Sequence, residues 1–274
     1  MKRVPFVKAT ACGNDFLLIE SKDVEGNKSE FARRICDRHF GVGADGVEWM
    51  SSEQGDDADV VIHLTNADGS PAEISGNGTR CVAAYWMWER ASRPKSAAAN
   101  RVSVTIRTDA GLKVCNLQKS DGNEFEFETD MGAGTVSEEL LIELDSGAVR
   151  GVPVSTGNPH FVMFVEKFAA NWQAQAAALG VHPHFPEGTN VELVRVVGPV
   201  EIEIRVYERG AGETQSSGTG SCASAVAAIA TGRARSPLRV VSPGGPQTVR
   251  WENGTIFLRG PATLICRGEY LWKA

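Results

Sequence analysis

Two short turns of nearly identical sequence place the strongest constraint on the fold of this chain. They are Ser75-Gly76-Asn77-Gly78 and Ser217-Gly218-Thr219-Gly220. Each follows a strand-like stretch and a polar segment, and each precedes an apolar run with helical character, at 79–91 and 222–232. The order of strand, polar turn and helix thus occurs twice, about 140 residues apart, which is much longer than a solenoid period. The sequence therefore predicts a duplicated structure with two similar halves.

The rest of the chain has mainly strand character. Period-2 alternation predicts strands over 16–20, 59–64, 102–108, 124–129, 161–165, 201–208, 239–241, 248–251 and 255–259. Further helices are predicted over 29–38 and 172–179, with Gly232 ending the helix at 222–232. We expect a surface loop over 89–100 and the break between the halves near 118–122.

The composition excludes several classes of protein. With 42% hydrophobic and 23% charged residues, the 274-residue chain can bury a core. A net charge of −6 and scattered Lys and Arg residues argue against nucleic acid as a partner. No apolar run approaches the ~20 residues that span a bilayer, and no signal-peptide core forms at the N-terminus, so we expect a cytoplasmic protein without a membrane partner. The six cysteines include no C-x-x-C pair, which favours reduced, mostly buried thiols over a zinc site.

A glycine-rich stretch, Gly41-Val42-Gly43-Ala44-Asp45-Gly46, fits the G-x-G-x-x-G pattern of dinucleotide-binding proteins. That motif requires a strand before it and a helix opening within it, whereas here a helix is predicted before it. We interpret these glycines as a tight turn from helix to strand.

The two serine turns are candidate anion sites. Small residues at a helix start leave backbone N–H groups free beside the positive end of the helix dipole, where a carboxylate or phosphate can bind. For either turn alone, a simple serine N-cap with glycines for the bend is the preferred interpretation. The duplication favours a site in which two helix starts hold one anionic ligand and supply one side chain on each side of it, as two-base proton transfer requires.

Further polar residues gather in the same parts of the sequence and are candidates for holding a zwitterionic substrate. Arg209 could hold a carboxylate and Glu208 an ammonium group, with His160 nearby. Each could equally be a turn or surface residue. The candidates are Asn14, Asn66, Asn158, His160, Asn190, Glu208 and Arg209.

Seven blocks of sequence, in order and running nearly end to end, resemble diaminopimelate epimerase. They are Gly13-Asn14-Asp15-Phe16, Arg38-His39-Phe40-Gly41-Val42-Gly43-Ala44-Asp45-Gly46, Asn66-Ala67-Asp68-Gly69-Ser70, Gly76-Asn77-Gly78-Thr79-Arg80-Cys81, Gly157-Asn158-Pro159-His160, Glu208-Arg209-Gly210-Ala211-Gly212-Glu213-Thr214 and Gly218-Thr219-Gly220. Seven matching blocks are far more specific than any one of them.

The resemblance implies an α/β (α+β) fold of two pseudo-symmetric domains, each a mixed sheet or barrel rolled around a central helix, with the active site in the cleft between them. We place these domains at 1–119 plus 265–274 and at 120–264. The implied reaction interconverts L,L- and meso-diaminopimelate in lysine biosynthesis, without pyridoxal phosphate, metal or other cofactor, in a homodimer. By the same likeness, Asn14, Asn66, Asn158, Asn190, Glu208 and Arg209 grip the substrate, and Gly76, Asn77, Gly218 and Thr219 hold its reacting carboxylate.

The sequence departs from the family at its two catalytic cysteines, where it has Ser75 and Ser217. A thiol of pKa ~8.5 can be tuned to a thiolate, whereas an alcohol is a far weaker acid. The serines could act as acid and base when activated by neighbours, for which His160 and Glu208 are the candidates. Alternatively, the chain could be an isomerase of a related amino acid, or a catalytically impaired or purely amino-acid-binding homologue, natural or made by Cys-to-Ser replacement.

Overall fold

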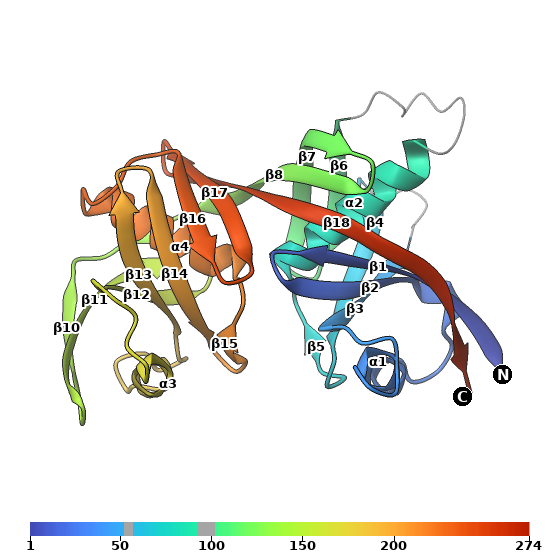
Figure 1. Ribbon diagram of the computed structural model, residues 1–274, viewed down its shortest axis with the longest axis horizontal. Helices are drawn as coiled ribbons and strands as arrows, with labels where there is room; N and C mark the ends of the chain where they lie inside the picture. Colours follow the sequence, from blue (N-terminus) through green and yellow to red (C-terminus); the bar gives the residue numbers. More distant parts are fainter. Residues whose placement is uncertain (52–56, 92–101, 274) are drawn as a thin grey trace. The chain divides into compact units, whose positions relative to one another are not determined.

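A computed structural model describes residues 1–51, 57–91 and 102–273 of the chain (Figure 1). The fold is mixed α+β, and its internal contacts divide it into two compact units. Unit 1 comprises Met1–Thr129 and Gly260–Ala274, and unit 2 comprises Asp130–Arg259. The predicted domain limits, after residues 119 and 264, stay a prediction.

Unit 1 is a set of strands around one apolar helix. Its elements are β1 (Lys2–Ala11), β2 (Asn14–Glu20), the short 3-10 helix η1 (Ser21–Asp23), α1 (Lys28–Cys36), β3 (Gly46–Ser51), β4 (Val60–Asn66), β5 (Pro71–Ala72), α2 (Gly76–Ala91), β6 (Ser103–Thr108), β7 (Gly111–Asp121), most of β8 (Glu124–Ala133) and most of β18 (Thr255–Trp272). The α2 residues Cys81, Val82, Ala83 and Ala84 are fully buried among side chains of the surrounding strands. A helix apolar on this many sides is a core helix. The amphipathic α1 packs in a second cluster with Trp49 and Trp272.

Unit 2 repeats this plan. Its elements are β9 (Thr135–Val136), β10 (Leu140–Leu144), β11 (Gly147–Ser155), β12 (Pro159–Phe164), α3 (Trp172–Gly180), β13 (Asn190–Gly198), β14 (Glu201–Glu208), β15 (Gly212–Thr214), α4 (Gly218–Ala230), β16 (Leu238–Ser242) and β17 (Gly245–Glu252), with the ends of β8 and β18. The alanine-rich α4 forms the centre of one apolar cluster, and α3 lies in another. Helix α4 thus has the place in unit 2 that α2 has in unit 1.

Strand pairing makes the duplication explicit. In unit 1, β2 runs parallel to β3 with Phe16 opposite Gly46, and β3 runs antiparallel to β4 with Val47 opposite Thr65. In unit 2, β12 runs parallel to β13 with His160 opposite Asn190, and β13 runs antiparallel to β14 with Val191 opposite Tyr207. Phe16 therefore corresponds to His160, Glu48 to Glu192 and Asn66 to Glu208. These correspondences matter for the chemistry of each unit.

The structure confirms the predicted fold class and contains a strand at each of the nine predicted places, with ends that differ by a few residues, except that the strand predicted over 255–259 continues to Trp272 as β18. Helices α2 and α4 begin at Gly76 and Gly218, earlier than predicted, because the glycines of both serine turns are already helical. The loop prediction over 89–100 was wrong at its start, since α2 continues to Ala91, and its remainder lies outside the described residues. The predicted break at 118–122 lies in the β7–β8 hairpin, whereas the unit division follows Thr129.

Two other expectations can be compared with the structure. None of the six cysteines, all of which the structure describes, is in a disulfide, and five are buried, with Cys266 exposed. Gly41–Gly46 joins α1 to β3, as the interpretation of a helix-to-strand turn predicted. Within the described residues, no helix is long and apolar enough to cross a membrane.

Candidate active site

The first serine turn, residues 75–79, caps α2. Ser75 Oγ accepts a hydrogen bond from Gly78 N at 3.1 Å, and Ser75 O accepts from Thr79 N at 2.8 Å. The first N–H groups of a helix have no acceptor within the helix. Because the N–H groups of Gly78 and Thr79 donate to Ser75, those of Gly76 and Asn77 are the donors in this turn to which a ligand can bind.

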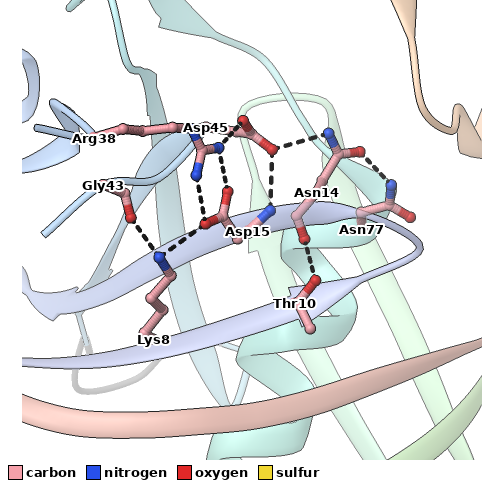
Figure 2. Close-up of polar contacts among 8 residues, drawn as sticks. All are labelled: Lys8, Thr10, Asn14, Asp15, Arg38, Gly43, Asp45 and Asn77. Carbon is pink, nitrogen blue, oxygen red and sulfur yellow. Dashed lines mark hydrogen bonds and ion pairs between the residues drawn. The ribbon is translucent and has the colours of Figure 1, made fainter. Parts of the chain in front are cut away.

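Asn14 and Asn77 belong to a chain of polar contacts that fixes both amides (Figure 2). Asn14 Nδ2 donates to Asp45 Oδ2 at 3.2 Å, while Asn14 Oδ1 accepts from Asn77 Nδ2 at 2.6 Å. Asn77 Oδ1 in turn accepts from the buried guanidinium of Arg80 at 2.5 Å. Each amide therefore has one defined orientation, set by Asp45 at one end and Arg80 at the other.

The outer end of this chain is an ion cluster. Arg38 donates to both Asp15 and Asp45 at 2.7 Å, and Lys8 Nζ lies 2.9 Å from Asp15 (Figure 2). Partial burial raises the pKa of Asp15, but hydrogen bonds from Arg38 and Lys8 outweigh it and leave the pKa below its usual value. Asp15 can thus serve as a charged acceptor for Arg38 and Lys8, and Asp45, which accepts from Arg38 and Asn14, holds the asparagine in place.

Glu48 lies directly behind the first serine turn. Its side chain, on β3, is fully buried, and neither carboxyl oxygen has a hydrogen-bond partner among the residues that the structure describes. A Cβ placed on Gly78 would overlap Glu48 Oε1. Position 78 therefore requires glycine, because the Glu48 carboxyl occupies the space that a Cβ would fill. Burial, together with the charge of Asp109, raises the pKa of Glu48 to about 8.

The second serine turn, residues 217–221, caps α4 in the same way. Ser217 Oγ accepts from Gly220 N at 3.2 Å, and Ser217 O accepts from Ser221 N at 3.0 Å. Burial raises the pKa of Glu208, and the neighbouring Ser217 hydroxyl opposes part of that rise. A carboxyl with a raised pKa beside a serine hydroxyl can accept the hydroxyl proton.

His160 is held by a second buried carboxyl. Its Nδ1 lies 2.7 Å from Glu192 Oε1, and its Nε2 lies 3.0 Å from Asn158 Oδ1. Burial raises the pKa of Glu192, while the charge of His160 and its hydrogen bond lower it, and burial has the larger effect. A Cβ on Gly220 would lie 2.8 Å from Glu192 Oε1, so this carboxyl stands behind the second turn as Glu48 stands behind the first.

Asn190 and Arg209 complete the polar residues of unit 2. Asn190 Nδ2 donates to Pro159 O, and its Oδ1 accepts from Arg209 N, both at 2.9 Å. The guanidinium of Arg209 donates to Glu187 O at 2.6 Å. Asn190 therefore joins the start of β12 to the end of β14, and it fixes the backbone from which Arg209 projects.

Most residues singled out in the sequence gather around the two helix starts of their own units. Asn14 and Asn77 are in contact in unit 1, whereas Asn66 Nδ2 donates to Ser70 Oγ at 3.1 Å. In unit 2, Asn158 contacts His160, and Ser217 lies beside Glu208. The roles assigned to Ser75, Gly76, Gly218 and Thr219, as to the others, stay predictions. Within the described ranges, no group of three or more His, Cys, Asp or Glu residues is placed to hold a metal ion.

Sequence reasoning missed Asp45, Glu48, Arg80 and Glu192. Glu48 and Glu192 did carry a signal, because each interrupts an otherwise apolar strand, in Val47-Glu48-Trp49-Met50 and Val191-Glu192-Leu193-Val194. A charged residue in a strand buried on both faces requires a partner or a function.

Solved structures of other proteins share this fold over nearly the whole chain. A phenazine biosynthesis protein of the PhzF family from Bacillus anthracis superposes with a TM-score of 0.73 at 18% identity, over 99% of this chain and 100% of the other. A hydroxyproline epimerase from Agrobacterium vitis superposes with a TM-score of 0.72 at 15% identity, over 98% of this chain and 91% of the other. At these identities the likeness shows the shared fold.

Sequence comparison identifies the family within this class. The diaminopimelate epimerase family model matches residues 6–136 and 152–265. The diaminopimelate epimerase of Pelotomaculum thermopropionicum is 37% identical, over 98% of this chain and 99% of the relative. That of Synechococcus elongatus is 38% identical, over 96% of this chain and 97% of the relative. The chain belongs to the diaminopimelate epimerase family, whose members are isomerases.

Proposed function

We propose that this protein interconverts L,L- and meso-diaminopimelate by two-base proton transfer at the α-carbon, with Ser75 and Ser217 as the proton-transferring groups. Family membership supports the substrate, since curated relatives of 35–38% identity over nearly the whole chain carry this activity in their names. The substrate would be held by Asn14, Asn66, Asn158, Asn190 and Arg209, and its reacting carboxylate by the N–H groups of the turns at Gly76, Asn77, Gly218 and Thr219.

One observation carries the proposal that serine can do this chemistry. Ser217 lies at the positive end of α4, accepts the Gly220 N–H, and lies beside Glu208, whose pKa burial raises. The helix N-terminus favours negative charge developing on Ser217 Oγ, and the raised pKa makes the Glu208 carboxylate a stronger base toward the Ser217 proton. His160 is held by Glu192 and Asn158, and it would balance the charge that develops on Ser217 and Glu208 during proton transfer.

The same proposal covers cofactor, compartment and assembly. The hydroxyl and carboxyl groups would move the α-proton without pyridoxal phosphate, because the helix N-termini stabilise the charge that develops on the substrate carboxylate. The family resemblance supports a cytoplasmic homodimer, which sedimentation of the purified protein would test.

The experiment is conversion of each isomer, followed by chiral chromatography from both directions. We expect L,L- and meso-diaminopimelate to approach the same mixture, and Ser75→Ala and Ser217→Ala each to stop the conversion while binding persists. Proline and hydroxyproline serve as competitors. Their conversion in place of diaminopimelate would assign a related substrate, and binding without any conversion would contradict the proposed activity.

A further inference from the structure

The buried carboxyl of Glu48 has no assigned role in the chemistry described so far. It is fully buried in the middle of the apolar strand β3, and both of its oxygens lack a hydrogen-bond donor among the described residues. Burying a carboxyl without partners is costly unless the group is neutral or has a function. The surrounding apolar core therefore gives no structural reason for a glutamate here.

The position of Glu48 relative to the first serine turn is closely defined. A Cβ built on Gly78 would overlap Glu48 Oε1 and would lie 3.3 Å from Ser75 Cβ, so the carboxyl and the serine lie on either side of one small space at the start of α2. Ser75 Oγ accepts from Gly78 N, and its own hydroxyl hydrogen has no acceptor within the part of the chain that the structure describes. Among the described residues, the Ser75 hydroxyl, a donor without an acceptor, thus lies near the Glu48 carboxyl, which has no donor.

Comparison of the two units shows why the first unit differs. In unit 2, Glu192 is bound to His160, and Glu208 is the carboxyl beside Ser217. In unit 1, the strand register places Phe16 where unit 2 has His160, and Asn66 where it has Glu208. Glu48 therefore lacks the partner of Glu192, and Ser75 lacks the carboxyl that Ser217 has.

We infer that Glu48 is the positioning residue that exchanges a proton with Ser75, as Glu208 does with Ser217. This inference rests on the proposed function. In one direction, the substrate Cα–H bond breaks, its proton passes to Ser217 Oγ, and the Ser217 hydroxyl proton passes to the Glu208 carboxylate. The carbanion then takes the Ser75 hydroxyl proton, and Ser75 takes the proton of the Glu48 carboxylic acid. One proton has moved from Glu48 to Glu208, and solvent exchange restores the starting state.

The titration of the two carboxyls agrees with this arrangement. Burial raises the pKa of both carboxyls, that of Glu48 to about 8, so Glu48 can carry at neutral pH the proton that it gives to Ser75. The other groups that act on this neighbourhood are Asp109 and, on α2, Cys81 and Arg80. Because Glu48 must carry its proton to return it to Ser75, kcat/KM should fall as the pH rises above about 8, where Glu48 is ionised.

The test uses Glu48→Gln, which keeps the size of the side chain and removes proton exchange. The control is Glu20→Gln, at the end of β2, another carboxyl of unit 1 whose pKa burial raises. We expect Glu48→Gln to lower kcat about 100-fold with KM nearly unchanged, and to lose the alkaline decline, whereas Glu20→Gln should match the unaltered protein. An unchanged kcat, or an alkaline decline that persists in Glu48→Gln, would overturn the inference.

A second readout does not depend on activity. Between pH 4.5, the ordinary pKa of a glutamate, and about pH 8, Glu48 is protonated in the folded protein but ionised in the unfolded chain. Stability from this group is therefore fully present below about pH 4.5 and is lost as the pH rises through about 8. The Tm of Glu48→Gln should lack this decline and exceed that of the unaltered protein at pH 9.

The variant Glu48→Leu distinguishes a chemical role of the carboxyl from a purely structural one. Leucine fills the same apolar space, so we expect a folded and equally slow protein. If both Glu48 variants fail to fold at every pH, the carboxyl is structural and the inference is wrong. Absence of conversion by the unaltered protein would contradict the proposed function and, with it, the inference; conversion by Glu48→Leu at the normal rate would contradict the inference alone.

Discussion

Glu192 Oε1 lies 2.7 Å from His160 Nδ1, and both side chains are completely buried. The pair joins the neighbouring parallel strands β12 and β13 behind the second serine turn. Its contact with Asn158 extends it to a residue proposed to bind substrate. A buried pair of this kind fixes geometry, because removal of one partner leaves the other without compensation.

We therefore predict that Glu192→Ala lowers the free energy of unfolding by about 3–5 kcal/mol, as measured by urea denaturation. The matched control is Glu203→Ala on β14, whose carboxylate lies 2.6 Å from Arg195 in a partly exposed pair. Such a pair contributes only about 0–1 kcal/mol. Equal losses in the two variants would contradict the structural importance assigned to the His160–Glu192 pair.

Asp45 should affect substrate affinity through Asn14. It accepts hydrogen bonds from Asn14 Nδ2 and from Arg38, so Asp45→Ala releases the Asn14 amide from its fixed orientation (Figure 2). We expect the Kd for diaminopimelate, measured by titration calorimetry, to rise about tenfold, equivalent to about 1.4 kcal/mol. Glu30→Ala, which removes surface ion pairs to Arg33 and Arg34, is the control and should bind normally. Unaltered affinity in Asp45→Ala would show that the amide chain does not orient a substrate-binding group.

Gly76 and Gly78 should respond differently to the same substitution. A Cβ on Gly78 would overlap Glu48 Oε1, whereas a Cβ on Gly76 has no neighbour within 4 Å. Gly78→Ala should therefore destabilise the fold by about 1–3 kcal/mol, and Gly76→Ala should change stability little. The added variant Glu48→Ala, Gly78→Ala should recover much of the loss in Tm. If Gly76→Ala and Gly78→Ala have the same Tm, the carboxyl does not occupy the space behind the turn.

These contrasts also show how far the sequence alone leads. Alternation and turn residues predicted the strands, and the repeated serine turns predicted the duplication, because both signals are local. Glu48 and Glu192 could not be assigned in this way. Both occupy the same kind of position in an apolar strand. Only the strand register shows that Glu192 has His160 on the neighbouring strand, whereas Glu48 has Phe16 at the equivalent position.

The network around Asn14 escaped sequence reasoning for a related reason. Asp45 and Arg38 lie in or next to the glycine-rich stretch 41–46, which was interpreted as a turn without any role for its charged residues. Their contacts with Asn14 and Asp15 join β2 to the segment that follows α1, and they depend on how that segment folds back. The helix starts were predicted too late because Gly76 and Gly218 are poor helix formers by propensity, although a capped first turn accommodates them.

Replacing both serines by cysteine should raise activity. A thiol is a much stronger acid than an alcohol, with a pKa of ~8.5, and the helix N-termini at Gly76 and Gly218 stabilise a thiolate. We expect Ser75→Cys, Ser217→Cys to raise kcat at least about tenfold, with each single variant in between. The assay requires reducing conditions and a fold check by Tm. A folded double variant slower than the unaltered protein would indicate that the site is adapted to serine or that the substrate is different.

The most direct measurement of the central claim is α-proton exchange in deuterated water. The unaltered protein is incubated at high concentration with L,L-diaminopimelate, and the α-proton signals are followed by NMR. We predict that deuterium enters the meso product at the inverted carbon before it enters the remaining L,L-isomer, because two different groups remove and deliver the proton. Retained binding with no exchange would contradict catalysis by Ser75 and Ser217, and the protein would then bind the amino acid without transforming it.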